Sequence, residues 1–99
     1  MQFEFTRQQI RDKAQELVPH LAPGLMRWVE HGMSPGHFLT AVLTNDLLET
    51  FTRGDDASLA GLKDIFRFLY NYCPSQCWGS PGKVGAWRGL YAMEKEGAA

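Results

Sequence analysis

Apolar residues recur at helical spacing along this 99-residue chain, and prolines and glycines separate the stretches in which they do so. In the first stretch, one helix face collects Ile10, Ala14, Leu17, Val18 and Leu21. No stretch alternates with period two for long enough to form a strand, and no Asn-Gly or Asp-Gly hairpin turn is present. The pattern predicts an all-α fold: a compact single-domain bundle of about five helices over residues 1–99, two of them short. Residues 1–5 and 95–99 are predicted to fray.

Capping residues predict where these helices begin. Thr6 and Gln9 have the spacing of a capping box, in which each side chain accepts a hydrogen bond from the other residue's backbone amide. Ser34 and Ser80 each precede a proline, and serine followed by proline is a common helix start. We therefore expect helix caps at Thr6, Ser34 and Ser80. The expected helices cover residues 7–22, 23–31, 35–53, 56–73 and 81–93.

The predicted helix over residues 35–53 has the most apolar sequence of the chain. Its first half is apolar nearly all round, with Phe38, Leu39, Ala41, Val42 and Leu43. A helix of this kind belongs in the middle of a fold, and its inner face is expected to continue through Leu47, Leu48 and Phe51. Asn45 and Asp46 interrupt it. We interpret them as a structural polar pair that bonds to a neighbouring loop or caps the helix after Ser80, in preference to a ligand site.

The fourth predicted helix leads into the two cysteines, Cys73 and Cys77. Its inner stripe is expected to contain Leu59, Leu62, Ile65, Phe66, Leu69, Tyr70 and Cys73. Zinc needs four ligands, and the only histidines near pair spacing are His31 and His37, so two free thiols are the favoured interpretation. A disulfide and a metal site are the alternatives. A nucleophilic cysteine would need a positioned histidine, and nothing near Cys77 in the sequence supplies one.

Small residues form a stripe on the predicted last helix: Gly82, Gly85, Ala86 and Gly89. Each glycine inside a helix costs roughly 1 kcal/mol relative to alanine. We therefore expect another helix to approach this stripe closely, and a partner's backbone lying in the same groove is the alternative.

Charge and composition exclude several classes of protein. Ten lysines and arginines stand against eleven acidic residues, for a net charge of −1, which argues against a nucleic-acid binder that works by neutralising phosphates. No apolar run is long enough to span a membrane, and the N-terminus lacks the features of a signal peptide, so a cytoplasmic protein is expected. The sequence contains no catalytic signature. It therefore predicts no enzyme, no cofactor and no metal.

Aromatic and cationic residues gather after the cysteines. Trp78 lies in a turn-rich loop, and Lys83 and Arg88 follow it. Aromatic and arginine side chains are common anchors of protein interfaces, so we predict that Trp78, Lys83 and Arg88 contact a partner. Trp28 and Trp87 lie at helical positions and are interpreted as core residues.

Two sequence blocks resemble a group of short proteins encoded by bacteriophages and prophages. The first is Ser-Pro-Gly-His-Phe-Leu-Thr-Ala-Val-Leu-Thr-Asn-Asp-Leu over residues 34–47. The second is Tyr-Asn-Tyr-Cys-Pro over residues 70–74, followed by Cys-Trp-Gly-Ser-Pro over residues 77–81 and by Trp87. The resemblance covers about residues 27–88. It implies a small cytoplasmic accessory protein of a phage, and the family has no activity that would transfer to this chain.

These observations favour a non-enzymatic protein-binding module that is directed at a host factor. One alternative is a nucleic-acid-associated regulator that uses residues 23–31 and 35–53 as a helix-turn-helix. That mode needs exposed Arg, Lys or Gln on the second helix, where Arg53 is the only cation. The other alternative is a metal-binding protein built on Cys73 and Cys77.

Overall fold

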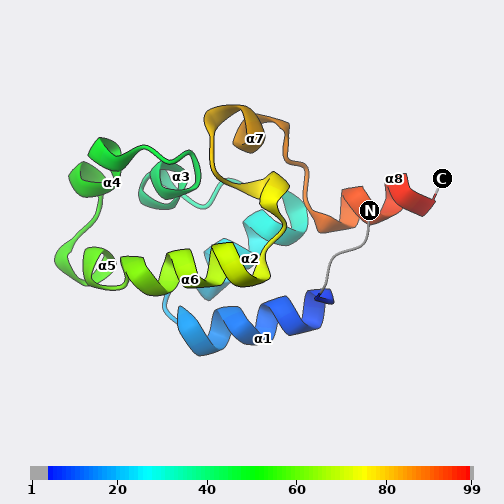
Figure 1. The fold of residues 1–99 in the computed structure, drawn as a ribbon, viewed down its shortest axis with the longest axis horizontal. Coiled ribbons are helices and arrows are strands. Elements are labelled where there is room, and N and C mark those ends of the chain that lie inside the picture. The colour runs from blue at the N-terminus through cyan, green and yellow to red at the C-terminus, as the bar shows by residue number, and fades with distance from the viewer. Residues whose placement is uncertain (1–4, 99) are drawn as a thin grey trace.

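The chain folds into a set of short helices that pack around one core. A computed structural model describes residues 5–98, and within them the elements are eight α-helices and one 3-10 turn, with no strand (Figure 1). The helices are α1 (Arg7–Leu17), α2 (Ala22–His31), α3 (His37–Leu43), α4 (Leu47–Arg53), α5 (Asp56–Ala60), α6 (Leu62–Tyr72), α7 (Pro81–Ala86) and α8 (Leu90–Ala98), and η1 covers Ser75–Cys77. The all-α prediction is confirmed.

The described helices outnumber the five that were predicted because three predicted helices are each divided. Asn45 has a φ angle of 64° and separates α3 from α4. Gly61 lies between α5 and α6, and the segment 87–89 separates α7 from α8, with Gly89 at a φ angle of 104°. A left-handed residue cannot continue a right-handed helix, so the chain turns at Asn45 and at Gly89.

The first helix is shorter than predicted. It ends at Leu17, and Val18 leaves the helical region with φ −137° and ψ 55°. Pro19 explains this end, because proline disfavours helical geometry in the residue before it. The second helix starts near Pro23 as expected and ends at Gly32, whose φ angle of 70° makes a left-handed C-cap.

The interior is assembled from both halves of the chain. Helix α1 packs against α2 and α6, and α2 also packs against α8. The segment around Phe38 lies in this interior as expected, since Leu39, Val42 and Leu43 are buried. In α6 the prediction was wrong for one side chain: Tyr70 is 79% exposed. Phe68, which was not assigned to the inner stripe, is fully buried in its place.

Two tryptophan side chains attach the C-terminal third to α2. The indole of Trp28 donates to the carbonyl of Cys77 at 3.0 Å, and the indole of Trp87 donates to the carbonyl of Trp28 at 3.0 Å. Both rings are buried, which confirms their interpretation as core residues. A backbone bond from Gly79 to the carbonyl of Leu43, at 2.7 Å, joins the same loop to the end of α3.

Two of the three predicted helix caps are present. Thr6 accepts from the amide of Gln9 at 3.1 Å, and the Gln9 side chain accepts from the amide of Thr6 at 2.8 Å. Ser80 accepts from the amide of Lys83 at 3.2 Å. The prediction for Ser34 was wrong. Helix α3 starts at His37, and its N-cap is Gly36, which has a φ angle of 99°. Ser34 and Pro35 therefore lie before the helix.

Ser80 and Ser34 offer a matched test, because both precede proline but only Ser80 caps a helix. Ser80→Ala is expected to lower the free energy of unfolding by about 1 kcal/mol, since the amide of Lys83 loses its acceptor. Ser34→Ala is expected to stay within about 0.5 kcal/mol of the wild type. Urea denaturation followed by circular dichroism measures both. Equal losses in the two variants would contradict the assignment.

The predicted fraying of the ends stays a prediction. Residues 1–4 and 99 lie outside the described residues. The ring of Phe5 lies 5.1 Å from that of Tyr72, so Phe5 is packed, and residues 95–98 belong to α8. Helix α8 extends from the end of the molecule opposite to α4 and α5 (Figure 1).

Candidate functional site

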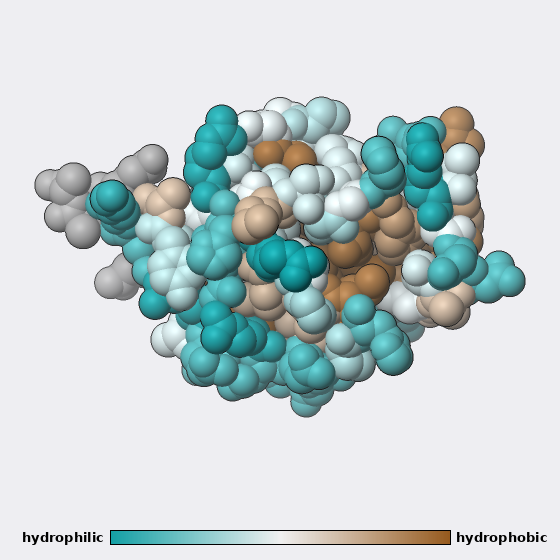
Figure 2. Space-filling model, turned by 180° about the vertical axis from the view of Figure 1, so that it is seen from behind, coloured by the Kyte–Doolittle hydropathy of each residue, from teal (hydrophilic) through white to brown (hydrophobic). Residues whose placement is uncertain are grey.

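Helix α4 presents its apolar side chains to the solvent and a polar one to the core. Leu47, Leu48 and Phe51 are 67%, 75% and 56% exposed, whereas Thr50 is buried. The expectation that these three apolar residues continue the inner face of the preceding helix was therefore wrong. Figure 2 shows hydrophobic side chains at the right-hand edge of the molecule, where α4 lies. We call Leu47, Leu48 and Phe51 the α4 face.

The turn before α4 causes this orientation. Because Asn45 is left-handed, α4 starts in a new direction and its periodicity no longer follows that of α3. Thr50 then faces the interior, where its hydroxyl donates to the carbonyl of Asp46 at 2.7 Å. An internal hydrogen bond of this kind lets a threonine be buried without an unsatisfied polar group. The apolar residues are left on the outside.

The structural role predicted for Asn45 and Asp46 takes a different form from the one expected. Asp46 is the N-cap of α4, and its carboxylate accepts from the amide of Glu49 at 3.1 Å. Asn45 is exposed in the turn that follows α3, so its side-chain amide is not buried and needs no partner within the protein. The sequence contained a signal for this start, because Asp46 and Glu49 have the spacing of an N-cap and its third helical residue.

A mostly apolar groove lies near the same end of the molecule. It runs between the α1–α2 connection and helix α5, with a volume of about 370 Å³. Leu17, Val18 and Leu21 supply its apolar lining, and Asp55 and Asp64 supply carboxylates. Figure 1 shows α4 and α5 together at this end, joined by the short connection after Arg53.

Acidic residues flank helix α4 in the chain and line the groove. Asp55 is the N-cap of α5 and accepts from the amide of Ser58 at 2.7 Å. This hydrogen bond lowers the pKa of the Asp55 carboxyl, so the group is charged at neutral pH. Asp56 follows it in the first turn of the helix. Asp64 is paired with Arg67 at 3.3 Å, and Glu49 with Arg53 at 3.1 Å.

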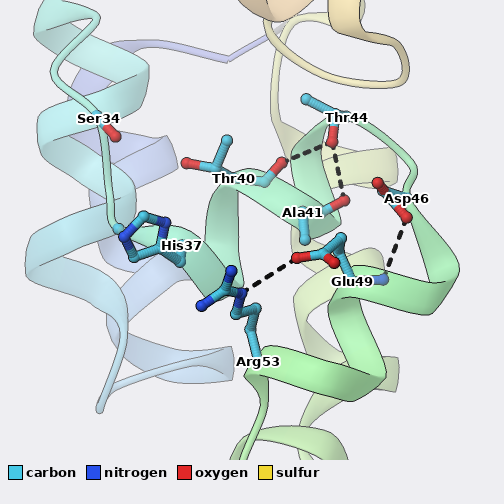
Figure 3. A pocket seen from close by; sticks show the side chains of 9 residues that line it. Ser34, His37, Thr40, Ala41, Thr44, Asp46, Glu49 and Arg53 are labelled. Atoms are coloured by element: carbon cyan, nitrogen blue, oxygen red, sulfur yellow. Dashed lines mark hydrogen bonds and ion pairs between the residues drawn. The ribbon is translucent and has the colours of Figure 1, made fainter.

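A second, more polar pocket lies between α3 and α4 (Figure 3). The polar groups drawn there bond mainly to each other or to the backbone. Glu49 binds Arg53, Asp46 accepts the amide of Glu49, and Thr44 donates to the carbonyls of Thr40 and Ala41. His37 points into the space beside Arg53. Within residues 5–98 no hydrogen bond is found between His37 and an acid or a hydroxyl.

The predicted contact residues lie before, within and after α7: Trp78 precedes the helix, Lys83 belongs to it and Arg88 follows it. Trp78 is half-buried, and its ring lies 6.0 Å from that of Phe66. Lys83 is exposed and lies near Gly79. Arg88 is exposed at the other end of α7, where it donates to the carbonyls of Gly85 and Trp87. Because Trp78 contributes to packing, replacing it would change stability as well as any binding.

The two cysteines are free thiols. Cys77 is buried and Cys73 half-buried, and burial, together with a hydrogen bond to Cys77, raises the pKa of the Cys73 thiol well above its usual range. A thiol held protonated in this way is a poor nucleophile. Across the described residues, no three His, Cys, Asp or Glu side chains are grouped so that they could hold a metal ion.

The predicted glycine stripe divides into two parts. Gly82 and Gly85 are exposed on α7, and no helix approaches them, so that expectation was wrong for these two positions. Gly89 is buried outside any helix and lies against the backbone of Glu30 and His31 at the end of α2. Of the three glycines in the stripe, only Gly89 is therefore close to the backbone of another helix.

Comparisons with known proteins identify no relative of this chain. No family model, no curated protein and no solved structure matches the chain. The similarity to short phage proteins thus depends on the two sequence blocks alone. In the part of the chain that the structure describes, no helix has both the length and the apolar character needed to cross a lipid bilayer.

Proposed function

We propose that this chain is a non-enzymatic protein-binding module that contacts its partner through the α4 face. The observation that carries the proposal is the exposure of Leu47, Leu48 and Phe51 on a helix whose buried residue is Thr50. Three such side chains give an apolar area of the order of a few hundred Å², the size of the largest apolar patch on a typical monomer, which is often functional. Removing that area from water would favour association.

The setting of this module is an accessory protein that acts in the cytoplasm of a host cell. The similarity of residues 34–47 and 70–81 to short phage and prophage proteins supports this part of the proposal. In that setting the partner is a host protein that the module binds and redirects. The α4 face and the first block overlap, since the block ends at Leu47.

The other candidate functions have less support. A helix-turn-helix formed by residues 23–31 and 35–53 would need a long second helix, but α3 ends at Leu43 after seven residues and contains no Arg or Lys. The polar pocket beside His37 offers no nucleophile that is hydrogen-bonded to a base.

Capture of a host protein tests the proposal. The wild-type chain is immobilised, and proteins retained from host lysate are identified by mass spectrometry. The double variant Leu48→Ser with Phe51→Ser is expected to lose at least about 90% of the specific capture, because central apolar anchors dominate interface energies. Its thermal midpoint is expected to match that of the wild type, since both side chains are exposed.

Tyr70→Ser is the matched control. Tyr70 is even more exposed than Leu48, but it lies on α6. This variant is expected to retain capture. Undiminished capture by the double variant, at an unchanged thermal midpoint, would show that the α4 face is not the binding surface.

A further inference from the structure

The charges around the α4 face indicate what kind of partner fits it. Residues 37–60 contain the acids Asp46, Glu49, Asp55 and Asp56 and a single cation, Arg53. Four acids and one cation give this segment a net charge of −3. Residues 61–93 contain Lys63, Arg67, Lys83 and Arg88 against Asp64, for a net charge of +3. The small overall charge therefore conceals an acidic segment that carries the α4 face.

The acidic groups at this end are available to a partner. Arg53 is paired with Glu49, and within residues 5–98 no ion pair involves Asp46, Asp55 or Asp56. Asp46 and Asp55 each bond to a backbone amide as helix caps, so their carboxylates are fixed in place. All three residues are exposed. Asp46 directly precedes Leu47 at the start of α4, and Asp55 and Asp56 follow soon after its end at Arg53.

A second copy of the chain is a poor fit to this surface. In a two-fold dimer the same patch contacts itself, so the two α4 faces would bring the acidic borders of both copies together. Like charges placed opposite each other across an interface oppose association. A basic partner has the complementary charge.

The backbone of the partner is also constrained. In residues 5–98 no strand offers an edge to which an extended segment could add. A segment that docks on α4 therefore has no strand to pair with, and an α-helix, which satisfies its own backbone hydrogen bonds, fits this surface best. Helix-in-groove binding uses apolar anchors at helical spacing, and the α4 face and the groove lined by Leu17, Val18 and Leu21 offer contacts to such anchors.

We propose that the α4 face binds an amphipathic helix of the partner protein whose apolar stripe is bordered by lysines and arginines. The inference rests on the proposed function and names the partner's chemistry. In the complex, apolar side chains of the partner helix cover Leu47, Leu48 and Phe51, and its cations lie near Asp46, Asp55 and Asp56. The apolar contacts provide affinity, and the charges provide orientation and selectivity.

A pair of synthetic peptides tests this partner chemistry. One is an 18-residue amphipathic helix of leucine and lysine, and the other replaces every lysine with glutamate. Fluorescence anisotropy with the wild-type chain is expected to show at least about tenfold tighter binding of the lysine peptide, because only that peptide complements the acidic border. Raising the salt concentration is expected to weaken its binding.

Two variants locate the peptide. Leu48→Ser with Phe51→Ser is expected to weaken binding of the lysine peptide at least about tenfold. Asp55→Asn with Asp56→Asn is expected to weaken it about three- to tenfold and to reduce its salt dependence. Asparagine is also a good N-cap, so this second variant removes charge while it preserves the start of α5. Lys63→Gln, on the basic segment, is the control and is expected to leave the affinity unchanged or slightly increased.

The outcomes separate this inference from the proposed function. Equal affinity for the two peptides would overturn the assignment of a basic partner, whereas the host-capture experiment would still test the α4 face. Binding of the lysine peptide that does not change in the Leu48/Phe51 variant would also overturn the inference. So would a dimer, detected by sedimentation, that is lost in that same variant, because the occupant would then be a second copy.

Discussion

Replacing Gly89 with alanine is expected to destabilise the folded chain by roughly 3 kcal/mol or more. Gly89 has a φ angle of 104°, which residues with a side chain rarely adopt. A Cβ atom at this position would lie 2.6 Å from the Cα of His31 and closer still to the carbonyl oxygen of Glu30. These are backbone atoms at the end of α2. They cannot rotate away, so the segment that joins α7 to α8 would have to separate from α2.

Gly85→Ala is the control for this experiment. A Cβ at Gly85 meets no atom within 4 Å, and the residue lies inside α7, so alanine is expected to be neutral or to stabilise by up to about 1 kcal/mol. Urea denaturation at neutral pH gives the free energy of unfolding of both variants. A Gly89→Ala protein within about 1 kcal/mol of the wild type would contradict the backbone contact with α2.

This contact illustrates a limit of sequence reasoning. The stripe of Gly82, Gly85 and Gly89 correctly indicated that a glycine admits a close neighbour, but it did not identify which one. A glycine on the α2 side of this contact is equally crowded. A Cβ on Gly32 would lie 2.8 Å from the carbonyl carbon of Arg88. Gly32 precedes Gly89 by more than fifty residues, so their contact depends on the whole fold.

Local signals predicted the elements whose causes are local. The capping box at Thr6 needs only Thr6 and Gln9, and the cap at Ser80 needs only Ser80 and Lys83. The early end of α1 was equally readable, since Pro19 restricts the residue before it. The burial of Leu39, Val42 and Leu43 followed from a run that has almost no polar face.

The orientation of α4 could be predicted only in part. Asp46 and Glu49 signal a new helix start, but the direction of that helix depends on the left-handed turn at Asn45. Periodicity alone favours burial of Leu47, Leu48 and Phe51 over Thr50. The structure has the reverse because α4 starts in a new direction after Asn45, and the bond from the Thr50 hydroxyl to the carbonyl of Asp46 allows Thr50 to be buried. The apolar residues of the α4 face are therefore visible in the sequence, but their exposure to solvent is not.

The burial of Trp78 differs from the expectation for a related reason. A tryptophan in a loop was expected to have few neighbours, but the loop that holds Trp78 is tied to the end of α3 through Gly79 and lies against α6. Trp78 is thus partly buried and packs against the core. The two surfaces can be distinguished by experiment. A substitution on the α4 face should weaken binding without changing stability, whereas a substitution at Trp78 should change the stability.

Trp87→Ala is expected to lower the free energy of unfolding by about 3–5 kcal/mol, a large part of the total for a domain of this size. The ring is 6% exposed and belongs to the core cluster, so its removal leaves a large cavity. Its indole also donates to the carbonyl of Trp28, which attaches the segment after α7 to α2. Denaturation followed by far-UV circular dichroism measures the effect without relying on tryptophan fluorescence.

Trp87→Phe separates packing from hydrogen bonding. Phenylalanine keeps most of the apolar contact but cannot donate to the carbonyl of Trp28. That carbonyl still accepts from the amide of Gly32 at 2.8 Å, so the expected loss is only about 1 kcal/mol. Tyr70→Ala, which removes an exposed ring from α6, should remain within about 0.5 kcal/mol of the wild type. If Trp87→Ala were as mild as Tyr70→Ala, the C-terminal third would not depend on this indole, and its attachment to α2 would come from the Trp28–Cys77 hydrogen bond and from the backbone contacts of Gly32 and Gly89.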